Sequence, residues 1–120
     1  MSNTSYHTTI INIILRMIIL TAGVFLAAYL VPGINVVGYG PAIKAAILLW
    51  ILNIFIKPLL LIFTLPINLL TLGLFTLIIN GFLLWFVGNV VSGFVVAGFF
   101  TAILGAVVIS VFSILLNRFI

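Results

Sequence analysis

The chain has 120 residues with four Lys or Arg, no Asp or Glu and no Cys, and 67% of it is hydrophobic. It has too little polar surface to cover a soluble globule, so it belongs in a lipid bilayer. Without carboxylates or thiols we expect no enzyme, no metal and no cofactor, and four scattered cations exclude a nucleic-acid partner.

The first apolar segment runs from Ile10 to Val31 and follows a polar stretch, residues 1–9, that predicts a loosely ordered tail. Arg16 lies inside this segment, and its long side chain can reach the headgroups. Because the charge lies inside the apolar run and not before it, an anchor is favoured over a signal peptide. A loop rich in Gly and Pro follows at 32–41.

Three more apolar segments follow, at 42–63, 67–91 and, after a break at Ser92-Gly93, 97–119. A bilayer crossing takes about 20 apolar residues, so four crossings fit. Four crossings place Arg16, Lys57 and Arg118 on one side and Lys44 alone on the other. Positive residues are retained on the cytoplasmic face, so we expect both termini to be cytoplasmic in a bacterial inner membrane.

The stretch 53–80 contains a kink and a reversal. Pro58 must kink a helix that runs through it, and Pro66 suits the first position of a new helix, which places the reversal near Thr64-Leu65-Pro66. Asn53 and Lys57 are one helical turn apart and share a face. Lys57 either reaches the headgroups or ties the kink to the next helix.

An internal repeat is suggested by a shift of sixty residues. The repeat rests on coincident glycines and similar loop-to-helix transitions. A catalytic dyad of Lys44 or Lys57 with a serine is a separate possibility, and no motif supports it. The matched pairs are Gly33 with Gly93, Val36 with Val96, Gly38 with Gly98, Tyr39 with Phe99, Ala42-Ile43 with Ala102-Ile103, Ala46 with Ala106, and Ile54 with Ile114. Each copy is a two-helix hairpin, residues 10–57 and 72–120, joined by a connector at 58–71. An even number of crossings per copy predicts parallel repeats.

Small residues recur every four positions in the fourth segment and at the equivalent place in the second. They are Gly98, Ala102, Ala106 and Ser110, with Ala42 and Ala46. Small side chains at this spacing let helix backbones approach closely. Such a stripe serves either packing within the chain or self-association.

The polar and kink residues also carry a family resemblance. They are Asn53, Lys57-Pro58, Thr64-Leu65-Pro66, the stretch 71–75 around Gly73, and Asn80. In type and spacing they resemble phage holin superfamily IV, a holin-like family of bacterial and phage membrane proteins with four helices. Two departures are Ser92, where a second Pro-Gly is common, and Val37 in place of an acidic loop residue.

The sequence thus predicts an all-α fold: one membrane domain, a bundle of four transmembrane helices in two parallel hairpin repeats. The first functional hypothesis is a non-enzymatic component that works by helix association in the lipid bilayer, as a homo-oligomer or as a small subunit of a larger membrane complex. The alternatives are the membrane lesion former that the family name implies, and a small channel or carrier.

Overall fold

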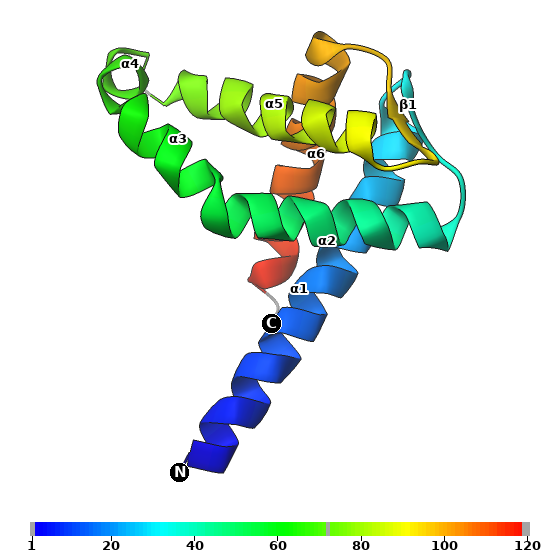
Figure 1. Cartoon of the computed structure of the whole chain (residues 1–120), viewed down its shortest axis with the longest axis vertical. Helices are drawn as coiled ribbons and strands as arrows, with labels where there is room; N and C mark the ends of the chain where they lie inside the picture. Colours follow the sequence, from blue (N-terminus) through cyan, green and yellow to red (C-terminus); the bar gives the residue numbers. More distant parts are fainter. Residues whose placement is uncertain (1, 72, 119–120) are drawn as a thin grey trace.

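A computed structural model describes the backbone of residues 2–71 and 73–118 and the side chains of residues 8–71 and 73–118. The chain is mostly helical, and α1 and α6 run in opposite directions while α2 and α5 cross them (Figure 1). The elements are α1 (Ser2–Leu30), β1 (Ile34–Val36), α2 (Tyr39–Phe55), α3 (Lys57–Phe63), α4 (Leu65–Leu70), α5 (Leu74–Val90), β2 (Phe94–Val96) and α6 (Phe99–Asn117).

The first helix is longer than its apolar segment. We expected residues 1–9 to form a loosely ordered tail, but α1 already begins at Ser2. No Gly or Pro interrupts the stretch 2–9, so a helix nucleated in the apolar segment extends through it at little cost. The first half of α1 projects well beyond the other helices (Figure 1).

Among the described residues, the two helices that are long and apolar enough to cross a bilayer are Thr8–Leu30 in α1 and Phe99–Asn117, which is α6. A third span results if α2 and α3 count as one broken crossing. Helix α5 is equally apolar but has 17 residues, slightly fewer than the roughly 20 that a crossing needs. The membrane character is therefore clear from the helices, and the fourth crossing stays a prediction.

A helix break lies at Ile56, two residues before Pro58. Helix α2 ends at Phe55, α3 begins at Lys57, and the two are bent by 42°, with Pro58 in the first turn of α3. Pro66 likewise lies in the first turn of α4, as expected. The reversal is not completed there, because α4 follows and the chain turns back only before α5, at Gly73, which has φ of 87°.

A two-stranded sheet corrects the expectation of a purely helical fold. Strands β1 and β2 pair antiparallel with Asn35 opposite Val95. Beyond the strands, the Val37 N–H donates to the Gly93 carbonyl and the Ala97 N–H to the Gly33 carbonyl, both at 2.8 Å. Three-residue strands are too short to show an alternating pattern, so the sequence indicated only loops there.

The sixty-residue shift that aligns the sequence also relates structural features. The shift relates the two flanking hydrogen bonds to each other. It also relates two edge-on aromatic contacts: that of Phe25 with Tyr39, whose ring centroids are 5.2 Å apart, and that of Trp85 with Phe99, whose ring centroids are 6.5 Å apart. Many core residues are buried at both equivalent positions. These pairs include Ile19 with Ile79, Val24 with Leu84, Ala27 with Val87, Ile34 with Phe94, and Leu49 with Ile109. The two hairpins thus bury equivalent positions in one core.

The small residues of α2 and α6 lie inside this core. Ala42, Ala46, Ala102 and Ala106 are all buried. Gly98 differs, because it precedes α6 and a Cβ there would meet nothing within 4 Å. In the arrangement of this single chain the alanines face other parts of the chain and not its exterior.

Helices α5 and α6 approach each other closely at a glycine outside that stripe. A Cβ added at Gly81 would lie 2.9 Å from the backbone Cα of Ile103, closer than real Cβ atoms approach. The backbone of α6 cannot yield as a flexible side chain can. Gly81 therefore sets the distance between these two helices.

We predict that Gly81→Ala lowers the stability of the purified protein in detergent by about 1–3 kcal/mol, the usual range for overpacking. Gly40→Ala is the matched control, because Gly40 is also helical and a Cβ there meets nothing within 4 Å. Thermal melting of both variants measures the difference. Equal melting temperatures would show that α5 and α6 are not packed as described.

Candidate functional site: a polar pit between the helices

A small pit of about 50 Å³ lies where five helices meet. Its walls combine four polar side chains with five apolar ones, in a protein with very few polar groups. The polar residues are Asn53, Lys57, Asn80 and Ser110, and the apolar ones are Leu20, Leu49, Leu84, Ala106 and Ile109. Polar groups in lipid surroundings tend to face the protein interior or a cavity, which makes this pit the candidate site.

The break between α2 and α3 positions two of the polar residues. Asn53 is in the last turn of α2 and Lys57 is the first residue of α3. They face the same pit although the helix bends between them. Asn53 is exposed and Lys57 half-buried, so both lie toward the open side of the pit.

Helices α5 and α6 supply the other two polar residues. Asn80 precedes the tightly packed Gly81, and Ser110 is one turn after the buried Ala106. Both side chains are half-buried. None of the four polar residues of the pit has a side-chain hydrogen bond within the part of the chain that the structure describes. Their donors are therefore free for a ligand.

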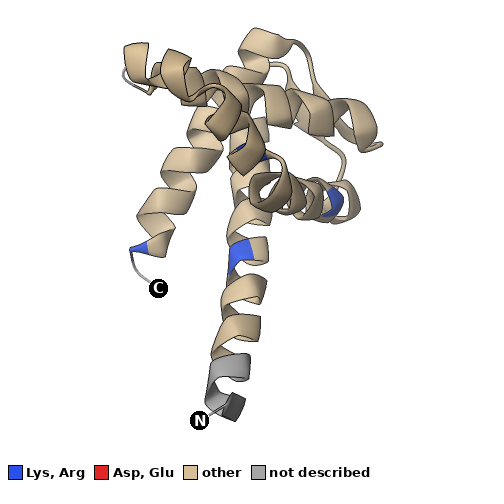
Figure 2. Ribbon diagram, turned by 60° about the vertical axis from the view of Figure 1, so that its left-hand side comes forward, with Lys and Arg blue, Asp and Glu red and all other residues tan. Residues whose placement is uncertain are grey.

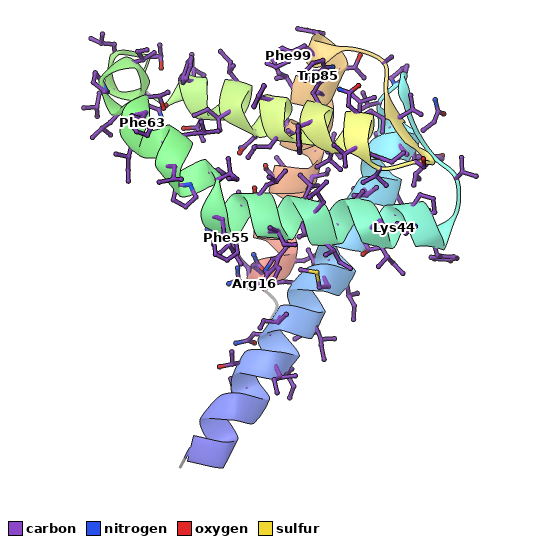
Figure 3. All side chains as sticks on the ribbon, in the orientation of Figure 1. Arg16, Lys44, Phe55, Phe63, Trp85 and Phe99 are labelled. Atoms are coloured by element: carbon purple, nitrogen blue, oxygen red, sulfur yellow. The ribbon has the colours of Figure 1, made fainter. Side chains whose placement is uncertain are left out.

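The surroundings of the pit are positive. Arg16 is on α1 one turn before the pit residue Leu20, and Figure 3 shows it below the crossing with α2. Figure 2 shows Lys and Arg at separate places and no acidic residue. Because the chain has no Asp or Glu, no side chain of its own neutralises Lys57.

The pit lies where the two hairpins face each other. Among the residues that line the pit, two pairs are related by the sixty-residue shift: Leu20 with Asn80, and Leu49 with Ile109. Asn80 and Ser110 correspond to Leu20 and Trp50, whereas Asn53 and Lys57 correspond to two other polar residues, Ser113 and Asn117, which do not line the pit. Of the four polar residues of the pit, two thus have a polar residue sixty positions away and two do not.

Of the polar and kink residues singled out in the sequence, the structure brings Asn53, Lys57 and Asn80 together at the pit. Pro58 adjoins it through the helix break, whereas Thr64, Pro66 and Gly73 do not line it. The Thr64 hydroxyl donates to the Leu60 carbonyl at 2.7 Å, within its own helical turn. These three residues shape the connector and contribute no group to the pit.

A hydrogen bond that the sequence does not predict closes the connector. The Thr76 hydroxyl contacts the Asn68 side-chain oxygen at 3.1 Å, which joins α4 to α5. The Gly73 N–H also donates to the Asn68 carbonyl, at 2.8 Å. The one indication of this hydrogen bond in the sequence is Asn68, a polar residue in an apolar run, two residues after Pro66.

The pit offers little for bond-making chemistry. Lys57 and Ser110 line it together, but they are not hydrogen-bonded to each other, so the serine has no activating base. Among the described side chains no group of His, Cys, Asp or Glu could hold a metal, and His7 lies outside the described side chains. The arrangement suits binding of a small polar or anionic group.

Comparisons with known proteins agree with a membrane location. A family model described as "Mycobacterial 4 TMS phage holin, superfamily IV" matches residues 11–115. A Bacillus subtilis (strain 168) protein named "Uncharacterized membrane protein YvlD" is 52% identical over 44 residues, a stretch that covers 37% of this chain and 37% of that protein. No solved structure matches with significant similarity. Because the family model covers most of its length, the chain belongs to the superfamily IV family of phage holin-like membrane proteins.

Proposed function

We propose that the protein is a non-enzymatic integral membrane component that acts by helix association, with further copies of itself or as a small subunit of a larger membrane complex. The observation that carries the proposal is an apolar groove between α1 and α2, on the outside of the molecule. The family membership supports a membrane component, and the proposed mode of action rests on the groove.

The groove measures about 490 Å³ and is far larger than the polar pit. Its walls are almost entirely apolar. They are Ile13, Ile14, Met17, Ile18, Thr21, Ala22, Phe25, Tyr39 and Ile43. The edge-on contact of Phe25 with Tyr39 bridges the two helices at one end.

A helix from another chain fits such a groove. Small residues in its walls, such as Thr21 and Ala22, permit close backbone approach, which drives association between helices in lipid. Ile10, Ile11 and Ile14 on the first half of α1 are each more than half exposed, so this part of the helix has no partner from this chain that covers them. Ile18, in the groove wall, is 59% exposed.

We further propose four crossings in a bacterial inner membrane, in two parallel hairpin units. The crossings are α1, the bent pair α2 and α3, α5 with its connector, and α6. In parallel units, one hairpin is related to the other by a rotation about an axis along the membrane normal. The orientation with more positive residues inside places both termini in the cytoplasm.

Cross-linking tests the association. The chain has no Cys, so Ile18→Cys labelled with a maleimide benzophenone reports only contacts at the groove. We expect illumination of membranes to link it to a second copy or to a larger partner. Leu115→Cys on α6 is the control, because Leu115 is 55% exposed and lies outside the groove. Monomeric mass in mild detergent together with equal, weak linking at both sites would refute the proposal.

The proposed topology has its own test. Reporters fused after Arg118 and before Ser2 should both show a cytoplasmic location, because Arg16, Lys57 and Arg118 then lie on the inner side. A fusion at Gly38 should report the opposite side. An external C-terminal reporter would contradict both the orientation and the even number of crossings.

A holin-type lesion former is the second candidate, and the description of the matching family favours it. Lesion formation and subunit assembly both need association, but they differ in outcome. Induction of a lesion former arrests growth and releases a trapped dye. Association without dye release supports the hypothesis of a subunit or homo-oligomer. Solute flux through liposomes, with neither association nor dye release, would favour a small channel or carrier.

A further inference from the structure

We propose that the polar pit binds a phosphate-type anion, either the headgroup phosphate of an anionic phospholipid or a free phosphate. This binding site is independent of the helix association proposed above. It rests on three observations: unpartnered donors that converge on one cavity, a cation without a counter-ion, and a matching cavity size.

The first observation is the set of donors. The Lys57 ammonium has three N–H groups and can accept nothing, and the Ser110 hydroxyl can donate once. The amides of Asn53 and Asn80 each add two N–H groups. All four side chains line one pit and have no hydrogen-bond partner among the described residues. A ligand rich in acceptor oxygens satisfies them together.

The second observation is charge. The half-buried Lys57 has no acidic side chain to pair with anywhere in the chain. Water can satisfy the amides and the hydroxyl, but it leaves the positive charge uncompensated in surroundings of low polarity. A neutral solute has the same defect, and a cation adds repulsion. An anion is the class of ligand that compensates this charge, and phosphate oxygens form strong charge-assisted hydrogen bonds with lysine.

The third observation is size and shape. About 50 Å³ holds on the order of three or four waters, close to the space that one tetrahedral phosphate group occupies. The pit is open on one side, and Leu20, Leu49 and Leu84 form apolar parts of its walls. A lipid can thus place its phosphate among the donors while its acyl chains continue along the apolar exterior.

Thermal melting of the purified full chain in a neutral detergent tests the proposal. The probes are phosphatidylglycerol, diacylglycerol as the matched lipid without phosphate, and inorganic phosphate. We expect phosphatidylglycerol to raise the melting temperature and diacylglycerol to have little effect. Stabilisation by inorganic phosphate alone would identify the free anion as the ligand, whereas stabilisation by phosphatidylglycerol alone would identify the lipid.

Two variants and two controls assign the effect to the pit. Lys57→Gln should raise the half-saturating concentration about tenfold through loss of the charged donor. Asn80→Leu, which copies the residue at the equivalent Leu20, should also weaken the response. The controls are Lys44→Gln, a lysine outside the pit, and Asn89→Leu, whose amide donates to the Trp85 carbonyl of its own helix at 3.0 Å.

The proposal is overturned if diacylglycerol stabilises the wild type as much as phosphatidylglycerol does, or if neither phosphate probe stabilises it. It is also overturned if Lys57→Gln and Lys44→Gln weaken the response equally, because the effect is then one of overall charge. The wild-type comparison decides the matter even if a variant does not fold.

Discussion

Backbone hydrogen bonding is the constraint on which this structure depends. In hydrocarbon no water is present to pair with exposed N–H and C=O groups, so a chain that leaves the helical conformation must find partners within itself. The segments that join α1 to α2 and α5 to α6 carry the buried Ile34 and Phe94, and inside the protein they meet the same constraint by pairing with each other, as β1 and β2. The flanking bonds from Val37 to Gly93 and from Ala97 to Gly33 extend the ladder at both ends.

The ladder also determines how the two helix pairs sit relative to each other. An antiparallel pair with Asn35 opposite Val95 keeps the same register when its two strands are exchanged. Phe25 contacts Tyr39 as Trp85 contacts Phe99. Equivalent small residues such as Ala42 and Ala102 are therefore buried in one shared core. The polar pit forms between the same two hairpins, at walls that include Leu49 and its equivalent Ile109.

Much of this architecture could be predicted from the sequence, for identifiable reasons. The lack of acidic residues and the long apolar runs indicate a membrane protein, and Pro58 and Pro66 locate helix boundaries because each lacks a backbone N–H. Asn53 and Lys57 could be placed on one face from their spacing alone. In contrast, the convergence of Asn80 and Ser110 on that face depends on how α5 and α6 pack, and spacing within a single helix carries no such information.

Other features left too weak a signal. Strands of three residues show no period, and β1 and β2 pair across sixty residues of sequence. Gly81 sets the approach of α5 to α6, but it does not belong to the regular stripe of small residues and stands among large apolar side chains. Pro66 marks the start of a helix without showing that the helix is short. The sequence therefore predicts the reversal of the chain at Pro66, earlier than in the structure.

The most direct test of the account is a disulfide across the ladder. In the Cys-free chain, Asn35→Cys with Val95→Cys places two exposed thiols on opposed residues, whose Cα atoms are about 5.5 Å apart in such a pair, within the range a disulfide spans. We predict rapid oxidation within one chain, and much slower oxidation for Asn35→Cys with Ala97→Cys, which is two residues out of register. Equal rates for the two pairs, or links only between chains, would contradict it.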